Sequence, residues 1–159
     1  MPEGDRIHMI SALLVHDVPI ECINQAAITY HVPATLIISV LGVEGGSVGM
    51  ASPNKNGTFD YGPMQINTIW LEKIKPYGYT REQIQYDPCA NVMVGTWILG
   101  TNIASTPDFW RGVAGYHSYT IPLNEQYQYK VRGIYHLLSD YLSKPTPTTA
   151  SSIAGGQIR

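Results

Sequence analysis

One carboxylic acid, at the end of an apolar segment, is the residue of this sequence best suited to acid chemistry. Glu44 follows the apolar run LIISVLGV, and Gly45 and Gly46, which favour the left-handed conformation that ends helices, come directly after it. Glu44 is therefore expected in or near a last helical turn. The negative end of the helix dipole and apolar neighbours such as Val40 and Val43 both disfavour its ionisation. These residues predict a raised pKa and a general acid that works near neutral pH.

The stretch DYGPMQIN, from Asp60 to Asn67, is the second candidate for a segment that faces a ligand. Its glycine and proline predict a tight backbone turn, and Gln65 places beside that turn an amide that both donates and accepts hydrogen bonds. This composition is typical of a cleft wall that meets a polar ligand. Asp60 has two interpretations, a structural cap of the turn or a second catalytic carboxylate.

Composition and charge exclude several function classes. The chain has 159 residues, which is enough for one domain with a sizeable core. Its net charge is −2, so the sequence indicates no basic face for a nucleic acid. The longest apolar runs are far shorter than a bilayer is thick, and the histidines show no metal-ligand spacing. We therefore expect no membrane span, no metal and no cofactor.

Helical periodicity dominates the chain and period-two alternation is rare, which predicts a mainly α fold. The segment 47–58 is expected either to form a small β-hairpin or to stay irregular. Proline and capping residues mark the helix starts. The expected helices run from an Asp17 cap and Pro19 to Tyr30, from Pro33 to Glu44, from Asn67 to Ile74, from Thr80 with Gln83 as a capping box, from Asp87-Pro88 to Ile103, from Thr106-Pro107 to Tyr116, and from Pro122 to Leu142.

These helices predict a single domain over residues 17–142. Residues 1–16 are interpreted as an N-terminal extension, and the His8-Met9 pair within them is consistent with vector-derived sequence. The apolar run ISALLV that follows is too short for a signal peptide. Residues 143–159, rich in Pro, Thr, Ser and Gly, are interpreted as a flexible tail.

The chain has two cysteines, Cys22 and Cys89, without metal-ligand or redox spacing. On spacing alone they are either buried free thiols or a disulfide between the helix that starts near Pro19 and the helix that starts at Pro88. A disulfide would indicate an oxidising compartment.

Four motifs in this order resemble the lysozyme-like domain of lytic transglycosylases, the fold of goose-type lysozyme and of soluble lytic transglycosylases. They are Glu44-Gly45-Gly46, the DYGPMQIN turn, the Asp-Pro-Cys-x-Asn segment from Asp87 to Asn91, and Tyr116-His117-Ser118 followed by Pro122, Asn124, Tyr127 and Val131. The cysteine pair and the last motif are similar to those of transglycosylases in type IV secretion and conjugation machines. The chain departs from the family pattern at Gly45, where serine is common, and at Pro63, where leucine or another apolar residue is frequent.

The resemblance implies an enzyme that acts on peptidoglycan glycan strands. Glu44 would protonate the bond between N-acetylmuramic acid and N-acetylglucosamine, the substrate's acetamido group would stabilise the positive centre, and Glu44 would then deprotonate the C6 hydroxyl. The product would be a 1,6-anhydro sugar. The resemblance also implies a Cys22–Cys89 disulfide, a periplasmic location reached by a signal that this sequence does not show, and components of a secretion or conjugation apparatus as partners. We expect a monomer.

The resemblance implies a substrate-binding set around Glu44. Gln65 and Tyr116 would bind sugar, and Tyr127 would position or polarise Glu44. Met64 and His117 complete the set. Each of these residues also has a simpler, purely structural interpretation. In that interpretation Glu44 is a solvated residue at a frayed helix end, and Gln65 satisfies backbone groups of its turn. Tyr127 then packs in the core, and His117 forms hydrogen bonds within its turn.

Two other functions are compatible with the same motifs. A muramidase would cut the same bond with Asp60 and water and release a reducing sugar. A catalytically weak scaffold would bind peptidoglycan and recruit other components of the apparatus. The sequence favours the transglycosylase over both.

Overall fold

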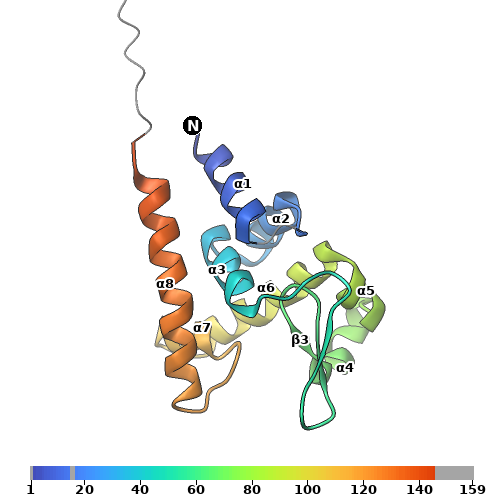
Figure 1. The fold of residues 1–159 in the computed structure, drawn as a ribbon. Coiled ribbons are helices and arrows are strands. Elements are labelled where there is room, and N and C mark those ends of the chain that lie inside the picture. Colours follow the sequence, from blue (N-terminus) through green and yellow to red (C-terminus); the bar gives the residue numbers. More distant parts are fainter. Residues whose placement is uncertain (1, 15–16, 146–159) are drawn as a thin grey trace, which may run out of the picture.

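The computed structural model describes residues 2–14 and 17–145, and this part of the chain is mainly helical (Figure 1). The helices are α1 (Glu3–Leu14), α2 (Ile20–Tyr30), α3 (Ala34–Glu44), α4 (Leu71–Ile74), α5 (Arg81–Tyr86), α6 (Pro88–Ala104), α7 (Phe109–Ala114) and α8 (Leu123–Ser143), with the 3-10 turns η1 (Thr68–Trp70) and η2 (Lys75–Tyr77). The strands are β1 (Ala51–Pro53), β2 (Phe59–Tyr61) and β3 (Ile66–Asn67). The predicted mainly α fold with a small hairpin is confirmed. Among the described helices, none is long and apolar enough to cross a membrane.

Helix α3 lies at the centre of the core and carries Glu44 at its last position. It packs against α1, α2 and α8. Because partners surround it, every residue from Leu36 to Leu41 is buried. The helix stops where the sequence predicts, since Gly45 has φ of 64° and its N–H donates to the Leu41 carbonyl. The packed helix therefore holds Glu44 on a rigid support.

Helix α6 forms the second buried element and packs against α2, α5 and α7. Its start follows the predicted pattern, because the Asp87 side chain accepts hydrogen bonds from the N–H groups of Cys89 and Ala90. Cys22 of α2 and Cys89 of α6 form a disulfide, with their Cα atoms 4.8 Å apart. The disulfide implied by the resemblance is thus present. The capping box of Thr80 and Gln83 is also present.

The strands form one antiparallel sheet in the order β1-β2-β3. Ser52 pairs with Asp60, and Asp60 pairs in turn with Asn67. Of the two alternatives for residues 47–58, the hairpin forms, but these residues supply only β1 and the loop, and β2 begins just after them. The third strand has only two residues and ends at the N-cap of η1, so no alternation in the sequence marks it.

One expectation about the N-terminal region needs correction. Asp17 does not cap α2, because Pro19 occupies the N-cap position, and the Asp17 carboxylate instead accepts a hydrogen bond from the Val48 N–H at 2.6 Å. Residues interpreted as an extension form helix α1, which packs against α3 and α8. Arg6 is buried there, and its guanidinium donates to the Tyr141 carbonyl. Of the predicted tail, residues 146–159 lie outside the described part of the chain.

The disulfide should contribute measurably to stability. It joins residues 67 positions apart in the sequence, and a disulfide typically raises the free energy of unfolding by roughly 2–4 kcal/mol. We expect a reducing agent to lower the melting temperature of the wild type. Circular dichroism melts with and without reductant would measure this, and the Cys22→Ala/Cys89→Ala double variant, which should not respond to reductant, is the control. Equal melting of oxidised and reduced wild type would contradict the prediction.

Candidate active site

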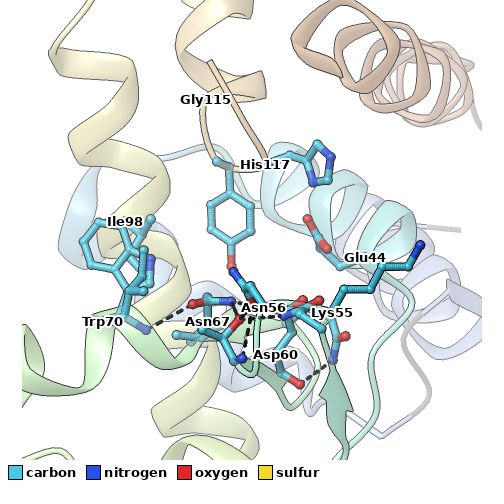
Figure 2. A pocket seen from close by; sticks show the side chains of 15 residues that line it. Glu44, Lys55, Asn56, Asp60, Asn67, Trp70, Ile98, Gly115 and His117 are labelled. Atoms are coloured by element: carbon cyan, nitrogen blue, oxygen red, sulfur yellow. Dashed lines mark hydrogen bonds between the residues drawn. The ribbon is translucent and has the colours of Figure 1, made fainter. Parts of the chain in front are cut away.

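A cleft of about 640 Å³ lies beside the end of α3, between the small sheet and the segment that follows α7 (Figure 2). Among the residues that line it are Glu44, Asp60, Gln65, Tyr116 and His117, all singled out by the sequence. The fold thus brings residues from three separate segments to one hollow. Their contacts determine what chemistry the cleft supports.

Glu44 is partly buried at the cleft and is held by one strong hydrogen bond. The Tyr127 hydroxyl donates to Glu44 Oε1 at 2.7 Å. The pKa of Glu44 is raised from its usual 4.5 to about 7, and burial is the largest cause. The hydrogen bond from Tyr127 lowers this pKa, the charge of Asp60 raises it further, and Lys130 lowers it. At neutral pH the carboxyl is therefore close to half protonated. Such a group can give a proton in one step and accept one in the next.

Tyr127 lies on α8, which packs against α3, and its side chain is buried. Burial also raises the pKa of Tyr127, so its hydroxyl stays a hydrogen-bond donor. Its ring stacks on the exposed ring of His117, with centroids 5.2 Å apart and planes 5° from parallel. Tyr127, expected in the substrate-binding set, is thus shielded from the cleft and contacts Glu44 through its hydroxyl, while His117 lines the cleft.

Tyr116 links two walls of the cleft. Its hydroxyl donates to the Met64 carbonyl at 2.6 Å, joining the segment after α7 to the turn between β2 and β3. Burial raises the pKa of Tyr116 well above its ordinary value, so this donor is also retained. Met64 itself differs from the expectation. Its side chain is fully buried, lies close to Gly95 and does not line the cleft, so Met64 contributes to the site through its backbone.

Gln65 serves the turn and the cleft at once. It has φ of 50°, an uncommon conformation for a residue with a side chain, and its Nε2 donates to the Gly62 carbonyl at 2.9 Å. This is the structural role that the sequence left as an alternative. The same side chain also lines the cleft, which is what the substrate-binding interpretation requires.

Asn91 fixes this turn, and sequence reasoning did not assign it a role in the site. The buried Asn91 side chain donates to the carbonyls of Tyr61 and Ile84, at 2.9 and 2.8 Å, and accepts from the Met64 N–H at 2.8 Å. It thereby holds the backbone on both sides of Gly62. The Asp-Pro-Cys-x-Asn motif marks Asn91, but its bonding partners in the turn lie about 30 residues away, so spacing does not reveal them.

Two glycines permit the close approach of backbone segments at the turn. A Cβ atom on Gly46 would collide with the Gly62 carbonyl, and a Cβ on Gly62, which has φ of 66°, would collide with the Asn91 side chain. Gly45, where the family commonly has serine, has open space around it. The chain after Glu44 can therefore pack directly against the turn only because residue 46 is glycine.

A polar wall that the sequence did not single out faces Glu44 from the sheet. Asn54, Asn56, Thr58 and Asn67 line the cleft and are bonded to one another through Thr58 Oγ1. Asn67 Nδ2 also donates to Asp60 Oδ1 at 2.8 Å. Asp60 is thus bound within the sheet as the structural interpretation predicts, and its charge still acts on Glu44. Within the described ranges, no group of three or more His, Cys, Asp or Glu residues is placed to hold a metal ion.

The burial of Glu44 should make stability depend on pH. Because the pKa in the folded state, about 7, lies above the usual 4.5, folding favours the protonated carboxyl; this stability is fully present below about 4.5 and is lost as pH rises from there through about 7. Glu44→Gln removes the ionisable group. The free energy of unfolding of this variant relative to wild type should therefore rise between pH 4 and pH 8, by up to about 3 kcal/mol.

Urea denaturation of both proteins at the two pH values would measure this difference. Glu72→Gln, at an exposed position, controls for replacing a carboxyl by an amide. A difference between Glu44→Gln and wild type that stays constant with pH would show that Glu44 ionises normally.

Comparison with known proteins places these features in a family. Residues 21–135 match the family described as Transglycosylase SLT domain. The chain is 27% identical over 125 residues to "Invasion protein IagB" of Salmonella typhi, covering 76% of this chain and 78% of that protein. It is 27% identical over 111 residues to "Protein IpgF" of Shigella flexneri, covering 69% and 73%. It is 28% identical over 131 residues to "Peptidoglycan-binding-like protein" of Escherichia coli O157:H7, covering 75% and 78%.

The family match begins just before Cys22 and ends within α8, so it includes Glu44, the turn around Gln65 and the α6 motif. It covers most of the chain, and it confirms the resemblance drawn from the motifs and the lysozyme-like fold class. The chain belongs to the transglycosylase SLT domain family, a family of lytic transglycosylases.

Proposed function

We propose that this protein is a peptidoglycan lytic transglycosylase that cleaves the β-1,4 bond between N-acetylmuramic acid and N-acetylglucosamine. The observation that carries the proposal is a cleft with a carboxyl, Glu44, whose pKa is about 7 and whose orientation is held by Tyr127. Membership of the SLT family supplies the substrate class. The residues of the cleft indicate how the individual steps of the reaction proceed.

Glu44 acts first as the acid. Its Oε1 accepts the hydrogen bond from Tyr127, which leaves Oε2 to deliver the proton to the glycosidic oxygen. As the bond to the leaving sugar breaks, positive charge grows on the muramic acid ring, and the substrate's own acetamido group stabilises it. The Tyr127 hydroxyl stabilises the carboxylate that remains on Glu44.

Glu44 acts next as the base. The carboxylate takes the proton of the C6 hydroxyl of the same muramic acid, and the C6 oxygen forms the bond to C1. Glu44 is then protonated again, the product has a 1,6-anhydro ring, and no water is consumed. A single carboxyl with a pKa near neutral serves both steps, because neither of its protonation states is strongly disfavoured.

Asp60 supports a second candidate function, hydrolysis by a muramidase. It lines the same cleft, and its charge acts on Glu44. A glycosidase needs such a second carboxylate as nucleophile or base. The hydrogen bond from Asn67 and the place of Asp60 in β2 favour the structural role instead.

The proposed setting is the periplasm, where the enzyme opens the wall locally for a secretion or conjugation apparatus. The Cys22–Cys89 disulfide fits an oxidising compartment. One relative is named a peptidoglycan-binding-like protein and another an invasion protein. Both names agree with this setting.

Mass spectrometry of the fragments released from purified peptidoglycan tests the reaction. Wild type should release fragments with anhydromuramic ends, Glu44→Gln should release none, and Asp60→Asn should give the same anhydro products as wild type. Circular dichroism shows whether each variant is folded. Reducing ends that disappear in Asp60→Asn would identify a muramidase instead. Binding to peptidoglycan without release by folded wild type would identify a scaffold.

The rate should fall as pH rises through about 7, because the first step needs protonated Glu44. Tyr127→Phe removes a bond that lowers the pKa of Glu44, so the fall should move to higher pH, and the optimal rate should drop roughly ten- to hundred-fold with the loss of a charge-assisted hydrogen bond. Turbidity of sacculi followed from pH 5 to pH 9 measures both effects. A rate that stays constant over this range would contradict the role given to Glu44.

A further inference from the structure

A second pocket, of about 200 Å³, lies outside the catalytic cleft. Its lining residues come from α2, the α4–η2 region and α6 and are Tyr30, Ile74, Tyr77, Tyr79, Val94 and Trp97. We propose that this aromatic pocket binds one N-acetylated sugar ring of the glycan strand, beyond the part of the strand that occupies the cleft. The inference rests on the proposed function only for the identity of the strand.

Aromatic faces dominate the pocket. Tyr77 is 74% exposed, although a large aromatic side chain is usually more buried. Its ring centroid lies 6.4 Å from that of the half-buried Trp97, with the planes tilted by 50°. Two tilted rings form a concave apolar surface, and the C–H face of a sugar ring packs well against such a surface. Ile74 and Val94 close the pocket from the core side.

Polar groups with free bonding capacity surround these faces. Within the described residues, the hydroxyls of Tyr30, Tyr77 and Tyr79 have no protein hydrogen-bond partner, whereas those of Tyr116 and Tyr127 each have one. Burial first, and then the neighbouring Tyr79, raise the pKa of Tyr30 above its ordinary value, so its hydroxyl keeps its proton. Hydroxyls that solvent can reach and that have no protein partner are free to bond the hydroxyl and acetamide groups of a ligand.

The pocket is connected with the catalytic cleft through a pair of tryptophans. Trp70 lines the cleft on the side away from Glu44, as Figure 2 shows. Its ring meets that of Trp97 edge to face, with centroids 5.9 Å apart. Trp70, Trp97 and Tyr77 therefore form a row of aromatic side chains from the cleft to the pocket. A strand that leaves the cleft at Trp70 would follow this row.

The surrounding charges favour a neutral sugar over a cation, the other common ligand of aromatic pockets. Among the residues that the structure describes, no carboxylate lines the pocket. The exposed Lys73 and Lys75 flank Ile74 in the chain, and Lys73 Nζ lies 4.7 Å from the centroid of the Trp70 ring. Their positive charge repels a cationic ligand but not an N-acetyl sugar.

Binding of chitin oligosaccharides tests the inference in a protein that does not cleave them. In the Glu44→Gln background, chitohexaose should bind roughly two- to ten-fold more weakly when Tyr77→Ala is added, because one aromatic stacking contact is lost. Chitobiose, which is too short to fill both sites, should show no such loss. Tyr129→Ala, which removes a tyrosine that is 83% exposed on α8, is the matched control and should bind like the parent. Isothermal titration calorimetry measures each of these affinities.

The outcomes separate this inference from the proposed function. Unchanged chitohexaose affinity in Tyr77→Ala, an equal loss in Tyr129→Ala, or no binding of chitohexaose at all would overturn the aromatic pocket as a sugar site. If wild type released no anhydro product while Tyr77→Ala still weakened chitohexaose binding, the pocket would be supported as a sugar site and the proposed transglycosylase activity would be rejected. Tyr79→Phe, which removes only a hydroxyl, should also weaken chitohexaose binding, and it does not disturb the fold's apolar packing.

Discussion

The burial of one carboxyl group between two helices is the constraint on which the rest of the site depends. Taking Glu44 out of water disfavours its charged form, and the fold tolerates this because the Tyr127 hydroxyl bonds the carboxyl directly. Tyr127 can do so only because α8 packs along α3. The pKa that makes Glu44 useful near neutral pH therefore depends on the packing of α8 against α3 as well as on the apolar residues of α3 itself.

The opposite wall of the cleft is built from backbone segments packed at close range. Gly46 and Gly62 leave room for this packing, and Asn91 satisfies the carbonyl and N–H groups that the turn would otherwise leave buried without partners. Tyr116 then joins the turn to the segment after α7. Each of these contacts is made to the backbone, so the shape of the wall depends little on the identity of the exposed side chains.

The sequence predicts those features that depend on local chemistry. The stop at Gly45, the cap at Asp87 and the capping box at Thr80 follow from residue types at fixed offsets, and all are present. Glu44 is predictable for the same reason. Features set by distant contacts are not: α1 forms where packing against α3 and α8 supports it, and the three hydrogen bonds of Asn91 join segments that no spacing relates. At Asp17 the local rule predicts a contact that does not form. Its carboxylate accepts a hydrogen bond from the distant Val48 N–H instead of capping α2.

The pKa of Glu44 in the folded protein is the most direct test of this account. Carbon-13 NMR of the side-chain carboxyl, titrated across neutral pH and assigned by comparison with Glu44→Gln, reports it without reference to any substrate. The account predicts a midpoint of about 7 in wild type and a higher one in Tyr127→Phe, because the lost hydrogen bond favours the charged form. A midpoint near the usual 4.5, or one unaffected by Tyr127→Phe, would contradict the central claim.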